Sequence, residues 1–185
     1  MKIYQGFSGL LSLPKGVALT IGNFDGVHRG HQSLINLAKS LGDDAGVAVA
    51  TFEPHPFVVL RPKDAPPRLT TKDQKQRLLE ELGVDHLVYL EPKPELLSLT
   101  AQDFWQKIRD ELQPAHMIEG KTFTFGKGRD GTIQRLKEWA DQSPVKLHIA
   151  PGVRVPLLDM HTVPVSSSLI RWLVINGRVR EAAIS

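Results

Sequence analysis

The chain has 185 residues, of which 41% are hydrophobic and 23% charged, and it carries a net charge of +3. This composition excludes a disordered or low-complexity chain, and the absence of cysteine excludes disulfides, thiolate metal sites and cysteine nucleophiles. No apolar run approaches the roughly 18 residues of a membrane span, and no export signal opens the chain. No long Lys/Arg block indicates nucleic-acid binding. We therefore expect a cytoplasmic protein that binds neither a membrane nor nucleic acid.

Apolar, β-branched segments alternate with amphipathic segments along the chain, which is typical of βα units around a parallel sheet. We expect strands at residues 17–21, 46–52, 86–90, 116–118 and 145–149. Helical patterns lie near residues 34–41, 78–82, 104–112 and 133–139, and a last helix is expected from 166–168 to 176–177. The predicted fold class is therefore α/β, a single domain over residues 1–185 whose parallel sheet of about five strands carries helices on both faces.

Two loops follow predicted strands. Residues 54–67 follow the second strand and are too irregular for a helix, and the glycine-rich residues 121–131 follow the fourth strand. Ligands of open parallel sheets gather outside the carboxyl ends of the strands. Both loops, with the turn after the first strand, fall on that edge, so we expect the ligand site there.

The segment GNFDGVHRGH, residues 22–31, joins a predicted buried strand to a predicted helix. His28 and His31 lie on one side of the first helical turn, and Gly30 between them is expected to leave room for a ligand. Unpaired amides at a helix start and imidazole N–H groups attract anions, which suits phosphate chemistry in nucleotidyl transfer. Alternatively, one histidine caps the helix and the other packs; a zinc site lacks a recognised ligand spacing.

The segment VSSSLIR, residues 165–171, places three serines where a helix is expected to begin and Arg171 one turn further on. Hydroxyls and unpaired amides at such a start can hold terminal phosphates while the arginine binds them with two N–H groups. Taken alone, the segment fits an ordinary serine cap with an exposed arginine better. Its pairing with HRGH favours the phosphate role.

Two further segments are candidates for binding a ligand. In TFEPHP, residues 51–56, prolines stiffen the exit from the second strand and present an apolar ledge, to which Phe57 can add. A rigid loop over a buried Phe52 explains this segment equally well. In FTFGKGRDG, residues 123–131, the aromatic residues are core candidates, and the glycines beside Lys127 and Arg129 make a flexible cationic loop for a phosphorylated ligand.

Together these segments resemble the N-terminal adenylyltransferase module of prokaryotic bifunctional riboflavin kinase/FAD synthetases. The resemblance covers nearly the whole chain and rests, in the family's order, on GNFDGVHRGH, TFEPHP, RLTTKDQKQRLLEELGVDHLVYL, FTFGKGRDG and VSSSLIRWLVINGRVREA. It implies a Rossmann-like nucleotidyltransferase fold that transfers AMP from ATP to FMN and yields FAD and pyrophosphate. It also implies Mg²⁺ accompanying ATP, with no direct protein ligand to the metal.

The resemblance also implies roles for individual residues. His28 and His31 would contact the ATP phosphates, and Ser167 and Arg171 would hold the leaving pyrophosphate. Further ATP-binding residues would be Gly22, Asn23, Phe24, Gly30 and Ser168. Residues that flank or line the flavin site would be Pro54, His55, Pro56, Phe57, Thr122, Phe123 and Phe125.

The chain departs from the family pattern at three positions and at its end. Thr122 stands where an acidic or amide residue is common, Leu169 where arginine is common, and Glu53 where aspartate is common. A riboflavin kinase domain follows in the family, whereas this sequence stops at Ser185; we therefore expect no kinase activity, from either a truncated enzyme or a stand-alone adenylyltransferase. The alternatives are a nucleotidyltransferase for another phosphorylated acceptor and a catalytically weak flavin- or nucleotide-binding module.

Overall fold

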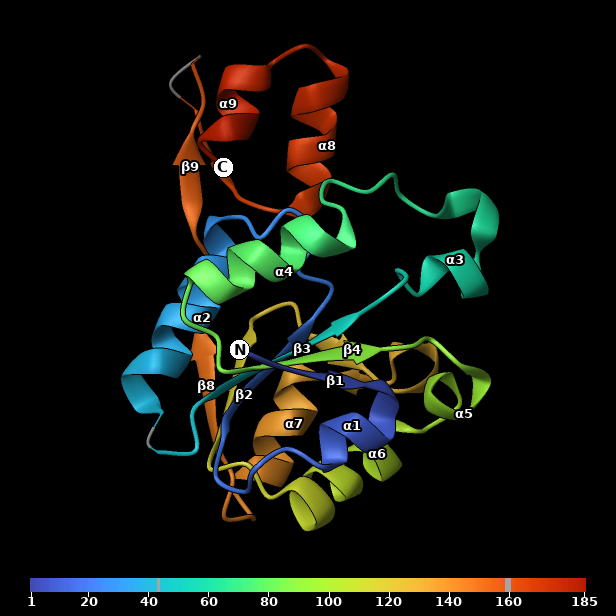
Figure 1. Ribbon diagram of the computed structural model, residues 1–185. Coiled ribbons are helices and arrows are strands. Elements are labelled where there is room, and N and C mark those ends of the chain that lie inside the picture. The colour runs from blue at the N-terminus through green and yellow to red at the C-terminus, as the bar shows by residue number, and fades with distance from the viewer. Residues whose placement is uncertain (43, 159–160) are drawn as a thin grey trace.

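A six-stranded parallel sheet forms the centre of the computed structural model, which describes residues 1–42, 44–158 and 161–185 (Figure 1). The strands lie in the order β1-β4-β3-β2-β5-β8 and helices cover both faces. The strands are β1 Lys2–Gln5, β2 Ala18–Gly22, β3 Val47–Phe52, β4 His86–Leu90, β5 His116–Gly120 and β8 Lys146–Ala150. The predicted α/β class with a parallel sheet is confirmed.

The sheet has one strand more than the five expected, because β1 joins its edge. Lys2 lies opposite His86 in the parallel pairing of β1 with β4, and three of the four β1 residues are exposed. An exposed edge strand lacks the continuous apolar run that marks a strand buried on both faces. Residues 2–5 therefore gave no strand signal, whereas the other five strands lie within two residues of their predicted bounds.

Apolar packing on both faces holds the helices to the sheet. Helices α2 Arg29–Leu41 and α4 Lys72–Glu81 cover one face, and α1 Gly6–Leu11, α6 Ala101–Lys107 and α7 Ile133–Ala140 cover the other (Figure 1). In β3, Val49 packs in the cluster that contains Leu79 of α4. Its neighbours Ala48 and Ala50 pack in the opposite cluster, with Phe104 of α6. Burial on both faces explains why the central strands show as continuous apolar runs.

Both predicted loops contain short regular elements. Helix α3 Phe57–Leu60 and the 3₁₀ turn Pro62–Asp64 follow β3, so the expectation that residues 54–67 contain no helix is wrong. The Phe57 amide donates to His55 Nδ1 at 3.1 Å, which supports the start of this helix. In the second loop, strands β6 Thr124–Phe125 and β7 Gly131–Thr132 form a small antiparallel pair around the 3₁₀ turn Lys127–Arg129.

The C-terminal segment lies above the carboxyl edge of the sheet. It contains the antiparallel strands β9 Arg154–Pro156 and β10 Thr162–Pro164, the expected helix α8 Ser167–Ile175 and an unexpected short helix α9 Val179–Ala183 (Figure 1). The Arg29 amide at the start of α2 donates to the Ser185 carbonyl at 2.9 Å. This contact joins the end of the described chain to the HRGH segment.

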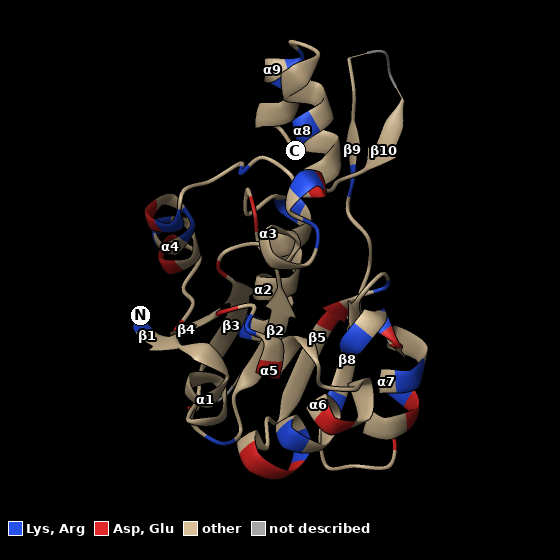
Figure 2. Ribbon diagram, turned by 90° about the vertical axis from the view of Figure 1, so that its right-hand side faces the viewer, with Lys and Arg blue, Asp and Glu red and all other residues tan. Residues whose placement is uncertain are grey.

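The remaining described elements lie beyond β4. They are helix α5 Pro94–Leu97 and a π-helical turn at Ile108–Leu112 that extends α6. Helices α4, α6 and α7 each carry both acidic and basic residues (Figure 2). Across the three described stretches, no helix has the length and apolar character needed to cross a membrane.

A buried carboxyl group lies where β2 and β5 separate. The strands pair at Ala18–His116 and Leu19–Met117, and beyond that point the Ile21 amide donates to Glu119 Oε1 at 2.9 Å. Glu119 is 1% exposed, and this burial raises its pKa well above the ordinary value, against a smaller opposing effect of the hydrogen bond. The strand order also reverses between β2 and β5, which is where open α/β sheets bind ligands.

The raised pKa of Glu119 predicts a specific dependence of stability on pH. The contribution of protonated Glu119 to the free energy of unfolding is complete below the pKa of the unfolded chain, about 4.3. It is lost as the pH rises toward the pKa of the folded protein, with a limiting slope of about 1.4 kcal/mol per pH unit for one proton. Glu119→Gln keeps an acceptor for the Ile21 amide and removes the titration. Urea unfolding should find variant and wild type equally stable at pH 4 and the variant more stable at pH 8; a constant difference between them would contradict this.

Candidate active site

The loop between β2 and α2 turns through three left-handed residues. The φ angles of Phe24, Gly26 and Val27 are 46°, 82° and 40°. This backbone region is uncommon for residues other than glycine and unfavourable for a β-branched valine, so surrounding contacts must hold the turn in place. The Phe24 ring is fully buried, and a Cβ atom on Gly22 would lie 3.2 Å from it. Phe24 therefore packs inside the turn, and neither its ring nor its main chain is exposed.

His28 and His31 stack at the start of α2, with ring centroids 3.6 Å apart. His28 is the N-cap residue, and the His31 amide donates to its Nδ1 at 3.3 Å. Because Nδ1 accepts, the neutral His28 ring carries its proton on Nε2, on the opposite side of the ring. The His31 ring also packs on Phe24, with centroids 4.8 Å apart. His28 thus caps helix α2, and His31 packs against Phe24. The cap uses only Nδ1 of His28, so its Nε2–H group remains a hydrogen-bond donor.

Burial keeps both imidazole rings uncharged near neutral pH. It lowers the pKa of His28 to about 4, outweighing its backbone hydrogen bond and the attraction of Asp25. The pKa of His31 lies well below its ordinary value, first because of burial and then because of the nearby His28 and Lys75. The buried His31 Nδ1 has no hydrogen-bond partner within the described part of the chain. Both rings are therefore suited to act as neutral hydrogen-bonding groups rather than as cations.

Protein atoms fill the space that the sequence suggested at Gly30. A Cβ atom there would lie 3.1 Å from His28 Cε1 and 3.3 Å from Val165 Cγ1. The absence of a side chain thus allows the His28 ring to fold over the helix start and the serine-rich segment to approach. The amides of Arg29 and His31 also have protein acceptors, so the α2 start has fewer donors for a ligand than expected.

Asp25 joins three distant segments of the site. Its Oδ1 accepts the amides of Leu69 and Thr70, each at 3.1 Å, and its carboxylate forms an ion pair with Arg171 of α8. Its carbonyl oxygen accepts the Ser167 hydroxyl at 2.8 Å. The side chains of Asp25 and Arg171 are only 11% and 13% exposed. The structure therefore brings the HRGH and VSSSLIR segments together, as the combined motifs suggested.

The residues expected to bind pyrophosphate also bind the protein itself. Besides the Asp25 contact, Arg171 Nε donates to the Pro67 carbonyl at 2.7 Å. A guanidinium has five N–H donors, so others remain for a phosphate. Of the three serines, Ser166 caps α8 by accepting the Leu169 amide at 3.1 Å, Ser167 binds Asp25, and Ser168 is exposed.

Sequence reasoning missed the buried Lys75 of α4. It is 4% exposed, and its Nζ lies 3.1 Å from the Asn23 carbonyl and 3.5 Å from Glu53 Oε2. Burial lowers the pKa of Lys75, while the charge of Glu53 opposes this shift. The helical spacing held a signal, because Lys75 precedes Leu79 by one turn and therefore lies on the apolar face of α4.

The first group of expected flavin residues lies against the HRGH segment. The Asn23 side-chain nitrogen Nδ2 is 3.1 Å from His55 Nε2, and the His55 and Phe57 rings meet edge to face with centroids 5.2 Å apart. The peptide bond between Glu53 and Pro54 is cis. The Asn23–His55 contact places the proline-rich exit of β3 beside the turn that precedes the histidine pair.

The second group surrounds β6. Phe125 is 9% exposed and packs against Phe104, Phe123 and Trp139, with ring centroids 5.7, 5.4 and 6.4 Å away. Phe125 is thus mainly a core residue, as its sequence context allowed, whereas Phe123 is partly exposed and Thr122 is exposed. No hydrogen bond or ring contact between described residues joins this group to the first.

The fold and the site define the class of protein. A histidine pair at the start of a helix, at the carboxyl edge and switch point of a parallel α/β sheet, is the arrangement of a Rossmann-like nucleotidyltransferase. A family model described as FAD synthetase matches residues 11–168. The chain belongs to the FAD synthetase family.

Relatives and solved structures agree with this assignment. The chain is 32% identical to an FAD synthetase of Listeria monocytogenes and 37% identical to a bifunctional riboflavin kinase/FMN adenylyltransferase of Escherichia coli, with 91% and 97% of this chain covered. It spans 67% and 62% of the lengths of these two relatives.

Among solved structures, a Streptococcus pneumoniae protein described as a macrolide-efflux protein matches with a TM-score of 0.83 at 26% identity, over 99% of this chain and 69% of that one. A Thermus thermophilus pantothenate synthetase matches with a TM-score of 0.56 at 16% identity, over 96% of this chain and 77% of that one. The likeness to pantothenate synthetase shows that the two proteins share a fold.

The hydrogen bond from the His31 amide predicts the tautomer and titration of His28. Imidazole ¹⁵N NMR should find the Nε2–H tautomer and a pKa of about 4, with His28→Gln identifying the signal. Because the pKa of His28 in the folded protein lies below the unfolded value of about 6.5, the neutral ring contributes fully to the free energy of unfolding above pH 6.5. This contribution is lost as the pH falls toward 4. A ring that titrates near 6.5, or that carries its proton on Nδ1, would contradict the geometry.

Proposed function

We propose that this chain is an FMN adenylyltransferase, which transfers the AMP moiety of ATP to FMN and yields FAD and pyrophosphate. The observation that carries the proposal is the family match over residues 11–168, supported by the stacked His28 and His31 at the carboxyl edge of the sheet. In the reaction a phosphate oxygen of FMN attacks the α-phosphorus of ATP. The new P–O bond forms as the bond to the bridging oxygen of pyrophosphate breaks, so no covalent enzyme intermediate is required.

The main task of the protein is to position two anions that repel each other and to offset their charge. Nε2–H of His28 donates to the ATP phosphates, with His31 stacked behind it, and neither ring needs to change its protonation state. The remaining N–H groups of Arg171 and the exposed Ser168 hydroxyl meet the leaving pyrophosphate. Because these donors are fixed before ATP binds, little reorganisation accompanies the growth of charge in the transition state.

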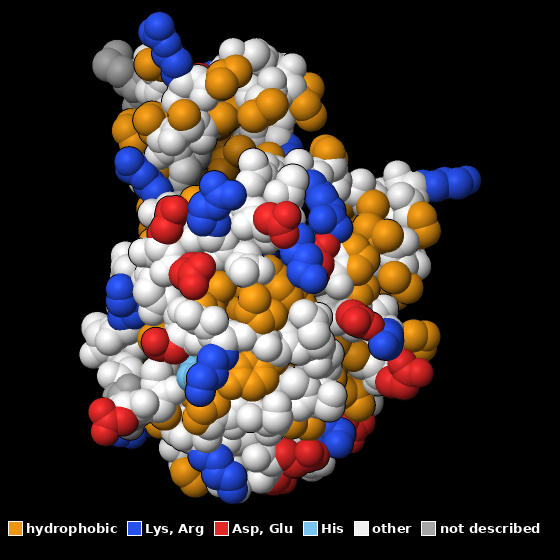
Figure 3. All heavy atoms as spheres, viewed as in Figure 1, with side chains coloured by type: hydrophobic (Ala, Val, Ile, Leu, Met, Phe, Trp, Pro, Cys, Tyr) orange, Lys and Arg blue, Asp and Glu red, His pale blue; other side chains and the backbone are white. Residues whose placement is uncertain are grey.

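The flavin ring is assigned to the ledge formed by Pro54, His55, Pro56 and Phe57. Exposed apolar side chains gather over the adjoining helix α3, where Val58, Val59 and Leu60 are about half exposed (Figure 3). This surface offers cover for an aromatic ring next to the Asn23–His55 contact. Phe123, with Thr122 beside it, is proposed to contact the ring from the second group.

Mg²⁺ is proposed to enter with ATP, bound by phosphate oxygens. Asp25, the carboxylate nearest the histidines in sequence, is occupied by backbone amides and Arg171. Within residues 1–42, 44–158 and 161–185, no group of three or more metal-ligating side chains comes together. The metal then offsets phosphate charge as part of the substrate complex.

The proposed reaction predicts equal amounts of FAD and pyrophosphate from ATP, Mg²⁺ and FMN. Chromatography with a coupled pyrophosphate assay measures both products. Riboflavin is the matched control acceptor, since it has the same ring but no phosphate nucleophile, and it should give no FAD. A folded chain that binds both nucleotides without forming FAD would overturn the proposal, and pyrophosphate release with another phosphorylated acceptor would redirect it.

The stacked histidines predict a kinetic effect on turnover. His31→Ala should lower turnover about 10²-fold or more while FMN affinity changes little, because the stacked His31 ring holds the His28 donor in place for the transition state. His148→Ala is a matched control, because His148 lies on the edge strand β8 and contacts His116 instead. Steady-state kinetics and thermal unfolding of both variants separate catalysis from folding. Unchanged turnover in His31→Ala would contradict the role assigned to this ring.

A further inference from the structure

The ring of His55 has a defined tautomer. The Phe57 amide donates to its Nδ1 at 3.1 Å, so Nδ1 is an acceptor and carries no proton. Burial lowers the pKa of His55 and the charge of Arg171 lowers it further, against an opposing effect of Asp25, so the ring is neutral near pH 7. The neutral ring therefore carries its single proton on Nε2.

This tautomer decides the orientation of the Asn23 side chain. With Nδ2 of Asn23 3.1 Å from His55 Nε2, two N–H donors would face each other. A rotation of the carboxamide by 180° exchanges its nitrogen and its oxygen, and the hydrogen-bond network decides between the two orientations. Because the His55 proton is on Nε2, the network places Oδ1 of Asn23 against His55 and turns the NH₂ group to the opposite side.

The turned NH₂ group of Asn23 is a fixed donor. The main chain of Asn23 is held because its carbonyl accepts the Thr51 hydroxyl at 2.8 Å and the Lys75 ammonium at 3.1 Å. Asn23 is exposed at the carboxyl edge of the sheet, so a ligand can reach its side chain. With the main chain and the side-chain oxygen both held, the NH₂ group keeps one direction before a ligand binds.

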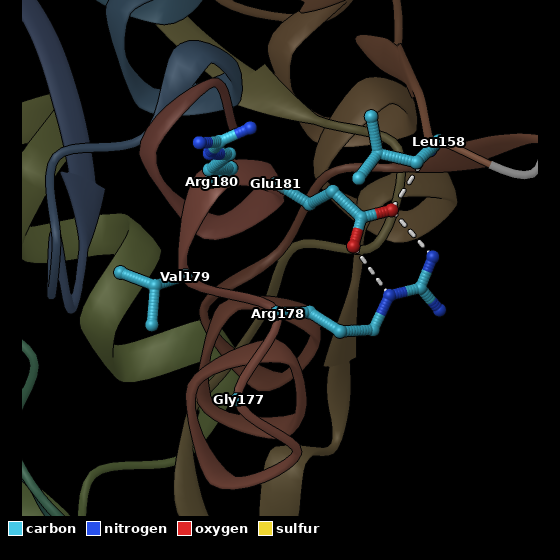
Figure 4. A pocket seen from close by; sticks show the side chains of 6 residues that line it. All are labelled: Leu158, Gly177, Arg178, Val179, Arg180 and Glu181. Atoms are coloured by element: carbon cyan, nitrogen blue, oxygen red, sulfur yellow. Dashed lines mark hydrogen bonds and ion pairs between the residues drawn. The ribbon is translucent and has the colours of Figure 1, made fainter.

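The pocket at the C-terminal segment is the opposite case. It is lined by Leu158 and residues 177–181, and the Glu181 carboxylate binds the Arg178 guanidinium and, at 2.8 Å, the Leu158 amide (Figure 4). These polar groups are bound to one another, whereas the NH₂ group of Asn23 is open to a ligand.

Asn23 lies at the junction of the two proposed substrate sites. It follows β2, whose Gly22 lies opposite Thr51 of β3, and the contact with His55 joins it to the ledge after β3. The histidine pair proposed to bind ATP comes later in the same turn. A flavin on the ledge reaches the α-phosphorus of ATP through its own phosphate, so the FMN phosphate lies at this junction.

We propose that His55 is a positioning residue, which holds the Asn23 carboxamide so that its NH₂ group donates to the phosphate of FMN. This inference rests on the proposed function, because it names FMN as the acceptor. It assigns Asn23 to the acceptor rather than to ATP, and it makes orientation of Asn23, rather than contact with the flavin ring, the main task of His55. A hydrogen bond to a charged phosphate is stronger than one between neutral groups, so Asn23 favours FMN over riboflavin.

The affinities for FMN and riboflavin separate this role from contact with the ring. Titrations contain Mg²⁺ and an ATP analogue with a methylene group between the α- and β-phosphates, which cannot release pyrophosphate. Asn23→Ala should weaken FMN binding about 10-fold or more, the range for a hydrogen bond to a charged group, and should change riboflavin binding less than twofold. Equal losses for FMN and riboflavin would overturn the proposal, as would weaker binding of the ATP analogue with unchanged FMN binding.

Two substitutions of His55 separate its two hydrogen bonds. His55→Asn keeps an acceptor for the Phe57 amide but loses the donor to Asn23, and it should weaken FMN binding about 3-fold while riboflavin binding is unchanged. His55→Gln keeps an N–H donor near the position of Nε2 and should restore most of the FMN affinity. The double variant of Asn23→Ala and His55→Asn should bind FMN as Asn23→Ala does, because His55 acts through Asn23. Additive losses would contradict this coupling.

Asn36→Ala is the matched control. Asn36 is exposed on α2, away from the ledge, and the substitution removes the same carboxamide group. Both flavin affinities should stay unchanged in this variant. If Asn36→Ala weakened FMN binding as much as Asn23→Ala, the effect would not come from the junction and the proposal would be wrong.

NMR of the wild type tests the geometry without any variant of His55 having to fold. Imidazole ¹⁵N signals should show the His55 proton on Nε2. In ¹⁵N-asparagine-labelled protein, FMN should shift the side-chain NH₂ signals of Asn23, identified with Asn23→Ala, while riboflavin should not, and the Asn36 signals should stay in place. A His55 proton on Nδ1, or Asn23 signals that respond equally to both flavins, would overturn the proposal.

The two proposals fail in distinguishable ways. If Asn23 and His55 favour FMN over riboflavin but no FAD forms, the proposed reaction is wrong and the role of His55 stands. If FAD forms while His55→Asn weakens FMN and riboflavin binding equally, the proposed function stands and the role of His55 is wrong.

Discussion

The site depends on the carboxylate of Asp25. Asp25 lies in the turn at residues 22–31 and binds two segments that are distant in sequence. It accepts the Leu69 amide in residues 67–71, and it contacts Ser167 and Arg171 in residues 165–171. The ion pair with Arg171 is largely buried, and removing one partner of a buried pair leaves an uncompensated charge that costs about 3–5 kcal/mol. Because the same residue fixes the turn and the start of α8, the two predicted phosphate-binding segments are assembled as one unit.

The cations of the site are paired with carboxylates before any ligand binds. Lys75 and Arg68 share Glu53, and Arg171 faces Asp25, while burial keeps His28 and His31 uncharged. Each cation is held by its carboxylate at a defined position rather than attracted into place by the substrate. For a reaction between two phosphorylated substrates, this arrangement provides oriented donors without requiring side chains to move as charge develops.

Sequence reasoning identified the elements whose signals are local. Strands such as β3 are apolar on both faces and separated by amphipathic helices, so five strands and the HRGH turn were predicted from pattern alone. The exposed edge strand β1 and the short helix α3 lack such patterns and form through tertiary contacts. The role of Lys75 was missed, and the partners of Asp25 were not predicted, because a charged residue does not show in the sequence which distant backbone groups it will bind.

The segment at residues 68–75 connects these observations. The turn that carries Phe24 and Val27 in left-handed conformations is locally unfavourable, so its geometry must be imposed by neighbours. Thr70 accepts the Gly26 amide at 3.2 Å, its own amide binds Asp25, and Lys75 binds the Asn23 carbonyl. One segment at the start of α4 therefore restrains the turn at successive peptides.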